Sequence, residues 1–370
     1  MLSAKRVLVV LSLLTWLCGY DPTHTQAQTG QELFTNQLTM PEGLAADLQG
    51  RVVAHSSGAS STVLTQFTPE GAASIQAPVG IPGPIDSLRF MGSQLDTDPV
   101  SGRIYLLSPN GDVLAIAPDT LQEISTRISI RSLDVDTSAV FDVSEDSFNP
   151  FNLTSETLYG DIAVFHSQVG NAPEKLELFL TGLSDDFPFV LRLRLDPAAG
   201  NVLSARVVLT STAPAPDSLS FPRGIAVNTL GMALTTLPVS TVDAVIGCPD
   251  AVVAFMHDFS DDEINLPEVL SASDGIPSWG MTTDANDNFY LATGGVNNMA
   301  CLQSGVGALV FVPFPLEPFT FFITPITVFP ASVSRPPDVA VSRLPDRRVY
   351  MTISNFNAII SFPAPDVLTE

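Results

Sequence analysis

Short apolar runs separated by polar turns recur along the chain. The clearest copy is Met40–Ser57, in which two runs of small and β-branched residues flank a turn over 47–50. Asp47 is suited to accept hydrogen bonds from the turn backbone, and Gly50 to adopt the left-handed conformation that such a turn needs. The pattern predicts a unit of two antiparallel strands.

The unit returns five more times, once with a longer turn. The residues that open the turns are Asp47, Asp98, His166, Asn228, Asp284 and Ser342. Their separations are 51, 68, 62, 56 and 58 residues, with a mean of 59. Most of these residues are Asp, Asn or Ser, which are typical of the first position of a type I turn. A period of this length favours one repeating domain over two unrelated ones.

Each unit is followed by a third apolar strand, and most units by a fourth. The expected third strands are 63–67, 113–116, 190–195, 252–255, 309–312 and 359–362, and the expected fourth strands include 124–130, 202–210 and 319–328. Six units of four short strands without helical periodicity predict an all-β fold, a six-bladed β-propeller with four-stranded antiparallel blades. A β-sandwich is the alternative, but it does not explain the period.

The two ends of the chain complement each other. The sixth unit runs out without a fourth strand, whereas Glu32–Thr39 is a spare strand ahead of the first unit. We expect this strand to pair near Ile359–Phe362, because closing the ring would cover two open sheet edges. The segment Ser144–Thr154 is expected to be an exposed insertion.

Residues 1–27 have the pattern of a secretory signal peptide, which leaves a single propeller domain over 28–370. Lys5 and Arg6 precede an apolar run that is too short to span a membrane, and Ala27 offers a small-residue cleavage site. Cys18 is an alternative site for a lipid anchor, although the three residues before it lack the small residue that such processing prefers. We therefore expect export to the periplasm or the extracellular space, without membrane insertion after cleavage.

Two cysteines, Cys248 and Cys301, follow the signal segment. A pair of cysteines in an exported protein favours a disulfide. Both fall between the second and third strands of neighbouring units, on the same face of the predicted ring. The sequence therefore predicts a Cys248–Cys301 bridge.

The chain is strongly acidic, with 16 Lys and Arg against 39 Asp and Glu and a formal charge of -23. Such a surface repels phosphate backbones, which argues against nucleic-acid partners. Cations, sugars and basic proteins remain compatible with it. The charge is also explained by solubility alone.

The recurring PxG[IL]A…D…G-x-[VI]-Y pattern, in copies such as PEGLAADLQGRVVAH and PRGIAVNTLGMAL, resembles NHL-repeat proteins. It is also similar to the wider six-bladed superfamily that holds the SMP-30/gluconolactonase enzymes. The resemblance implies a propeller fold over the whole of 28–370. It does not imply one activity, because this superfamily mixes enzymes, binding modules and scaffolds.

One residue per unit is expected at one mouth of the central channel. Counting back five positions from each turn residue, with one position of slack in the last unit, gives Glu42, Ser93, Asp161, Arg223, Trp279 and Asp338. Three of these are carboxylates, which as oxygen ligands suit a hard divalent cation such as Ca²⁺. The alternative is that Arg223 pairs with the carboxylates and water fills the rest.

In the SMP-30-like enzymes, the resemblance implies a metal held by a first-blade Glu with Asn and Asp from later blades. Glu42 matches that Glu, but Arg223 and Trp279 stand where the other ligands are expected. This departure argues against lactonase activity. No HExxH motif, nucleophile elbow or phosphate-binding loop offers another catalytic centre, and no catalytic residue is assigned.

Two functions remain. The first is a non-catalytic, monomeric, exported binding or scaffold module for a protein, a glycan or a small ligand. The second is a metal-dependent hydrolase of the lactonase or esterase type with a rearranged channel site. Retention of a stoichiometric divalent cation by the purified protein separates the two.

Overall fold

The structure is a computed structural model, and strands make up most of the part of the chain that it describes. The described residues are 32–38, 41–57, 62–80, 94–167, 174–185, 187–212, 224–238, 250–256, 268–271, 278–293, 306–312, 314, 324–330, 338–345, 347–353 and 357–364. Within these ranges the strands are accompanied by one short 3-10 turn, η1 (Ile130–Ser132). The predicted all-β fold is confirmed.

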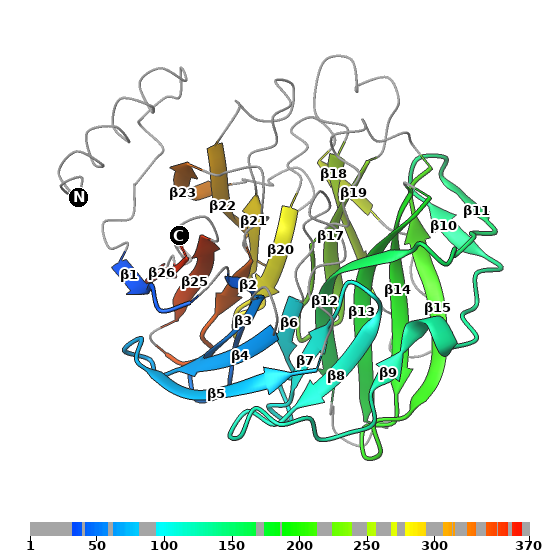
Figure 1. The fold of residues 1–370 in the computed structure, drawn as a ribbon. Helices are drawn as coiled ribbons and strands as arrows, with labels where there is room; N and C mark the ends of the chain where they lie inside the picture. The colour runs from blue at the N-terminus through cyan, green and yellow to red at the C-terminus, as the bar shows by residue number, and fades with distance from the viewer. Residues whose placement is uncertain are drawn as a thin grey trace.

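The described strands form five four-stranded sheets and one six-stranded sheet, which we number in chain order (Figure 1). The first sheet contains β2 (Pro41–Ala46), β3 (Val52–Ser57), β4 (Thr62–Phe67) and β5 (Ala73–Val79). The second contains β6 (Gln94–Thr97), β7 (Ile104–Leu107), β8 (Asp112–Ile116) and β9 (Ile128–Ser129). The fourth contains β16 (Ile225–Val227), β17 (Met232–Pro238), β18 (Asp250–Met256) and β19 (Glu268–Ser271). The fifth contains β20 (Ser278–Thr283), β21 (Phe289–Thr293), β22 (Val306–Val312) and β23 (Thr324–Pro330).

The third sheet departs from the predicted four strands. Its regular part is β12 (Leu158–Ser167), β13 (Lys175–Ser184), β14 (Phe187–Leu195) and β15 (Val202–Thr210). Two further strands, β10 (Val140–Asp142) and β11 (Ser147–Asn149), extend it beyond β15, and β10 pairs with β15 in parallel. The expected insertion at 144–154 is thus partly strand, because β11 pairs with β10, which itself lies on the edge of β15.

The sixth sheet joins the two ends of the described chain. Its order is β1 (Glu32–Thr35), β26 (Ala358–Pro363), β25 (Arg348–Ile353) and β24 (Val339–Val341). Strand β1 lies antiparallel to β26, with Leu33 opposite Ile360, as Figure 1 shows for the blue and red ends of the ribbon. The predicted pairing between the N-terminal strand and the last unit is therefore confirmed.

The first strand of each sheet lies toward the centre of the molecule. These inner strands contact one another in the order β2, β6, β12, β16, β20 and β24, and β24 contacts β2 again. Figure 1 shows β2, β6, β12 and β20 side by side in the middle of the ribbon. Strands β2, β16 and β24 are buried at every position, because they have packed sheets on both faces.

The turns that follow the inner strands form as the sequence predicts. Asp47 Oδ1 accepts hydrogen bonds from the backbone N–H groups of Gln49 and Arg51, at 2.9 Å each. Gly50 has a φ of 76°, the left-handed conformation that closes the turn. Asp98, Asn228, Asp284 and Ser342 accept equivalent bonds in their own turns. These polar residues are buried because the turn backbone satisfies them.

The predicted fourth strand at 124–130 is mostly wrong. Strand β9 covers only Ile128–Ser129, and η1 follows it at once. The N–H of Ile130 donates to the carbonyl oxygen of Gly111 at 2.8 Å, and its side chain is buried. Burial of Ile130 in the core thus ends the strand early.

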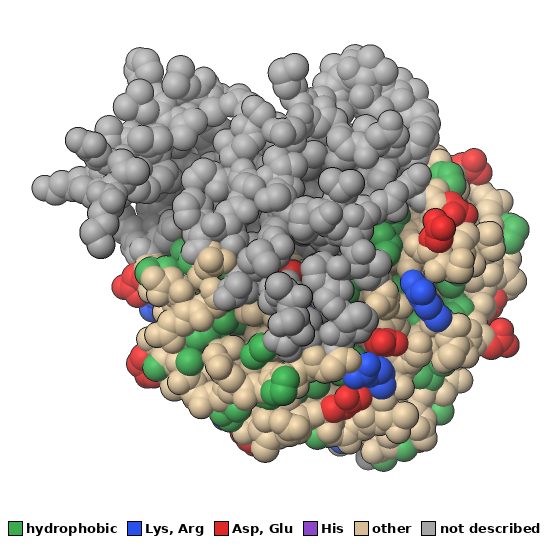
Figure 2. Space-filling model, viewed as in Figure 1, with side chains coloured by type: hydrophobic (Ala, Val, Ile, Leu, Met, Phe, Trp, Pro, Cys, Tyr) green, Lys and Arg blue, Asp and Glu red, His purple; other side chains and the backbone are tan. Residues whose placement is uncertain are grey.

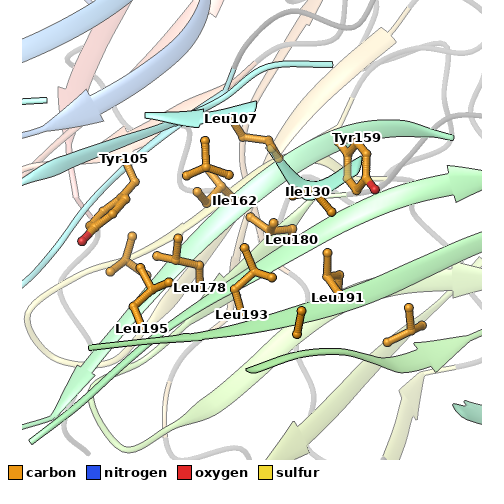
Figure 3. Close-up of a cluster of buried hydrophobic side chains, with 14 of the residues drawn as sticks. Tyr105, Leu107, Ile130, Tyr159, Ile162, Leu178, Leu180, Leu191, Leu193 and Leu195 are labelled. Carbon is orange, nitrogen blue, oxygen red and sulfur yellow. The ribbon is translucent and has the colours of Figure 1, made fainter. Parts of the chain in front are cut away.

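The largest apolar cluster of the described residues lies between the second and third sheets (Figure 3). Tyr105 and Leu107 of β7 face Ile162, Leu178 and Leu193 of the third sheet there. Each is at most 2 % exposed, which makes this junction a continuous core. No helix among the described residues is long and apolar enough to cross a membrane.

Candidate functional site

The predicted channel residues are only partly within the described chain. Ser93 and Arg223 lie outside the described residues, as do both cysteines of the predicted disulfide, Cys248 and Cys301. Trp279 lies on β20, between Ser278 and Gly280. The three predicted carboxylates, Glu42, Asp161 and Asp338, are all described and buried.

Asp161 lies on β12, where the pairing with β13 shifts register between Tyr159 and Ile162. Its Oδ1 accepts a hydrogen bond from the N–H of Ile162 at 2.9 Å. Its Oδ2 reaches two other inner strands, accepting from the N–H of Ile225 on β16 at 2.9 Å and of Met281 on β20 at 3.3 Å. One carboxylate thus connects the third, fourth and fifth sheets.

Asp338 stands immediately before β24 and repeats this arrangement. Its Oδ1 accepts from the N–H of Val339 at 2.8 Å, and its Oδ2 accepts from the N–H of Leu44 on β2 at 2.6 Å. Its own N–H donates to the hydroxyl oxygen of Thr352 at 2.8 Å. Asp338 therefore ties the sixth sheet to the first, across 294 residues of sequence.

Asp96 on β6 is a third carboxylate of the same kind, and counting from the turn residues missed it. Its Oδ1 accepts from the N–H of Thr97 at 2.8 Å, and its Oδ2 from the N–H of Val164 on β12 at 2.7 Å. Asp96 lies between Leu95 and Thr97 of the short strand β6, Gln94–Thr97. Its position, two residues before Asp98, differs from the predicted five.

Burial raises the pKa values of all three carboxyl groups. Removal from water raises the pKa of Asp338 to about 8 and that of Asp96 to about 6. For Asp161, burial and then the negative charge of Asp338 raise the pKa well above its usual value. The backbone N–H bonds oppose these rises because they favour the ionised form. Since the charges of the three groups affect one another, they form one cluster, which we call the inner carboxylate cluster.

Glu42 makes a different contact. Its Oε2 lies 3.5 Å from Nδ1 of His55, a side chain that is 1 % exposed on β3. The pairing of β2 with β3 shifts register between Pro41 and Gly43, next to Glu42. Among the described residues, no group of three or more His, Cys, Asp and Glu side chains is arranged to hold a metal ion.

The opposite end of the inner strands carries an ion pair between the second and third sheets. Nδ1 of His166 lies 2.8 Å from Oδ1 of Asp98, and its Nε2 lies 2.7 Å from Oε1 of Glu174. Burial alone lowers the pKa of His166, but the hydrogen bonds and charges of Asp98 and Glu174 outweigh burial and raise it. The buried His166 therefore lies between two carboxylates that favour its protonated form.

Comparison with solved structures gives the fold. A luciferin-regenerating enzyme superposes on this chain with a TM-score of 0.50 at 10% sequence identity, covering 90% of this chain and 95% of that one. The fold is that of a β-propeller. Likeness at this identity shows the architecture alone.

Other propellers match with lower scores. A PQQ-bound aldose sugar dehydrogenase from Streptomyces coelicolor gives a TM-score of 0.47 at 11% identity, over 93% of this chain and 99% of that one. The WD40 repeats of RRP9 give 0.46 at 9% identity, over 91% and 99%. No protein-family model and no curated protein matches the sequence.

Proposed function

We propose that this chain is an exported, six-bladed β-propeller that serves as a non-catalytic, monomeric binding or scaffold module. Its ligand is a protein, a glycan or a small molecule held on one face of the ring. The observation that carries the proposal is the way in which the inner carboxylates hydrogen-bond to the backbone. Both oxygens of Asp96, Asp161 and Asp338 accept backbone N–H bonds, one within their own strand and one from a neighbouring sheet. That pattern is expected of residues that join blades.

The six-bladed assignment takes the six-stranded third sheet as one blade with two added strands. Two observations support it, namely the contact order of the six inner strands and the return of β24 to β2. Strand β1 then closes the ring as the outer strand of the last blade. Pairing of this kind covers the outer edge of β26.

Export is proposed from the sequence pattern of residues 1–27 and from the two remaining cysteines. N-terminal sequencing of the protein recovered from a secreting host is expected to begin after Ala27. Non-reducing peptide mapping is expected to recover Cys248 and Cys301 in one cross-linked peptide. Free thiols at both positions in the secreted protein contradict the disulfide.

The second candidate is a metal-dependent hydrolase with a Ca²⁺ ion in the channel, held by Glu42, Asp161 and Asp338. It is favoured by the raised pKa values of Asp161 and Asp338, since buried and mutually repelling carboxylates are frequent at functional sites. A bound cation would lower both values by neutralising the repulsion. The known propeller enzymes share only the fold with this chain.

Metal content and melting separate the two functions. The binding module is expected to retain no stoichiometric divalent cation and to melt at the same temperature in calcium and in chelator. A hydrolase is expected to retain one ion and to melt higher in calcium, because a ligand bound to the native state stabilises it. Glu42→Gln would then reduce the calcium effect, whereas Glu156→Gln, at an exposed loop position, would not.

Ligand capture tests the binding role itself. The purified, labelled protein is applied to a glycan array and to an array of extracellular proteins. Saturable binding that persists in Asp161→Asn is expected, because Asp161 joins strands inside the ring. Hydrolysis of a simple lactone by the wild type, lost in Asp161→Asn, supports the second candidate instead.

A further inference from the structure

A groove of about 410 Å³ lies between the second and third sheets, lined by Glu123–Thr126 and Ala199–Asn201. One wall is the segment that connects β8 to β9, and the other is the turn that connects β14 to β15. The walls meet at Gly200, where an added Cβ atom would lie 3.9 Å from Cβ of Ser125. Both connections join the third strand of a sheet to the fourth, so they lie at the same end as the turn at Asp98 between first and second strands. The groove is therefore on one face of the ring.

The first wall is a bulge in the second sheet. Strand β8 pairs Val113 with Ile128, and Ile116 forms a bridge with Glu123. Between these pairs β8 has two residues, 114 and 115, whereas the opposite segment has four, 124 to 127. The extra length leaves Ile124 47% exposed at the groove. Bulges of this kind redirect side chains at the edge of a sheet.

Both walls are held in place by their own turns. In the first, the buried Leu121 donates its N–H to the carbonyl oxygen of Ala117 at 2.8 Å. Its φ of 54° is left-handed, which a leucine keeps only where its surroundings fix it. In the second, Oδ1 of Asp196 accepts from the N–H groups of Ala198 and Ala199, at 2.9 Å each. The groove is thus formed before a ligand arrives, which reduces the entropy lost on binding.

The lining residues offer hydrogen-bonding groups and little apolar surface. Ser125 and Thr126 carry hydroxyl groups, and Asn201 carries a carboxamide. Among the described residues, none of these three side chains has a hydrogen-bond partner. Ile124 adds one exposed aliphatic side chain. Donors and acceptors are therefore available beside a small apolar contact.

The groove also has little net charge. Among the described residues that line it, Glu123 alone has an ionisable side chain, and its Oε2 lies 3.6 Å from Nη2 of Arg127. An anionic ligand finds no cation in the lining and meets a chain whose formal charge is -23. A basic peptide has to compete with Arg127 for a single carboxylate. A neutral ligand that is rich in hydroxyl groups fits the groove best.

We propose that this groove binds a neutral oligosaccharide. Sugar hydroxyls both donate and accept hydrogen bonds, which matches the hydroxyls of Ser125 and Thr126 and both ends of the Asn201 carboxamide. The side chain of Ile124 packs against the C–H groups of a sugar ring, which removes apolar surface from water. The inference rests on the proposed binding function, and it names the class of ligand and its place on the ring.

Binding is measured first with the full-length wild type. The labelled protein is applied to an array of short oligomers of glucose, mannose, galactose and N-acetylglucosamine, beside oligomers of galacturonic acid. Saturable binding of a neutral oligomer is expected, with equal strength in low and high salt because no ion pair forms. A preference for galacturonic acid oligomers, or loss of binding in high salt, overturns the proposal.

Substitutions in one turn locate the site. Ala199 is exposed and lines the groove, so Ala199→Trp fills the space of the sugar. Calorimetric titration with the neutral oligomer that the wild type binds is expected to show a loss of affinity of about tenfold or more. Ala198→Trp is the matched control, since Ala198 is exposed in the same turn but does not line the groove. Asn201→Ala removes one hydrogen-bonding side chain and is expected to weaken binding about three- to tenfold.

The outcomes distinguish this inference from the proposed function. If Ala199→Trp and Asn201→Ala bind the neutral oligomer as the wild type does, the groove is not the site, although the binding function stands. If the wild type binds an extracellular protein but no sugar, and Ala199→Trp loses that binding, the ligand class is wrong. If the wild type binds nothing on either array, both the inference and the binding function fail. Thermal melting shows whether each variant is folded, and Asn201→Ala decides the question if Ala199→Trp is not.

Discussion

The junction between the sixth and first sheets and the junction between the second and third join equivalent inner strands in different ways. At the first of these, Asp338 accepts from Leu44, and the ring of Phe34 lies 4.8 Å from that of Tyr350 and 6.0 Å from that of Phe67. At the second, Asp96 accepts from the N–H of Val164, and the contact between His166 and Asp98 lies next to the largest apolar cluster of the described residues. Aromatic rings pack across the junction of the sixth and first sheets, whereas the junction of the second and third combines an apolar core with an ion pair.

The difference follows from how the chain reaches each junction. The second and third sheets are consecutive in sequence, so the connecting chain keeps them close and limits the entropy lost on docking. The sixth and first sheets come from opposite ends, and no short connection holds them. Strand β1 takes the place of that connection, because it pairs with β26 while its Phe34 reaches the first sheet. The closing junction therefore depends on a segment of four residues.

Removal of residues 28–39 is the strongest way to break the closing junction. The truncated protein loses strand β1 and the Phe34 ring, and the edge of β26 becomes unpaired. We expect aggregation or loss of the cooperative melting transition, measured by calorimetry and size-exclusion chromatography. Leu33→Ser is the matched control, because Leu33 is 61% exposed on the same strand. A truncated protein that melts like its parent contradicts the closure model.

Gly280→Ala is expected to have the next largest effect, since it displaces Asp338 from the closing junction. The added methyl group would lie 2.2 Å from Oδ1 and 2.8 Å from Cα of Asp338. Because a backbone atom must move, we expect a loss of about 2–3 kcal/mol in the free energy of unfolding in urea. Gly80→Ala, whose Cβ would lie 4.0 Å from Nη2 of Arg127, the nearest atom given by the described residues, is the control and is expected to be near neutral. If the two substitutions change the free energy of unfolding equally, the surrounding structure accommodates the added methyl group near Asp338 without strain.

His166→Gln tests the junction between the second and third sheets. The raised pKa of His166 means that its contribution is complete below the ordinary histidine pKa and is lost as the pH rises through the folded value. We expect a loss of about 2 kcal/mol at pH 5.5 that shrinks at higher pH, measured by urea unfolding. Glu174→Gln, which removes the 40%-exposed partner, should cost less. If the loss in the free energy of unfolding is the same at every pH, His166 contributes through packing alone.

Arg348→Gln is expected to have the smallest effect. Arg348 Nη2 lies 3.0 Å from Oε2 of Glu32 on β1 and donates to Ser361 on β26 at 2.8 Å. Since the Glu32 side chain is 69% exposed, the pair should contribute at most about 0.5 kcal/mol. The difference from wild type is measured in low and high salt. A larger loss of stability that does not change with salt would show that the hydrogen bond between Arg348 and Ser361 contributes to the closing junction.

The sequence by itself determined the features that depend on neighbouring residues. The turns at Asp47, Asp98, Asn228, Asp284 and Ser342 form because each side chain satisfies its own turn backbone. The apolar runs between them are strands for the same local reason. Even the pairing of β1 with β26 was predictable, since an unmatched strand at one end met a missing strand at the other.

The tertiary structure alone decided which carboxylates meet. Counting positions assumed regular strands, but the pairing of β2 with β3 shifts register between Pro41 and Gly43, next to Glu42. Glu42 therefore contacts His55, whereas Asp96 joins Asp161 and Asp338. A one-residue shift in a strand turns a side chain to the other face, and its cause is long-range pairing. The parallel pairing of β10 with β15 was not predictable for the same reason. Neither segment's own sequence indicates that the other has a free strand edge.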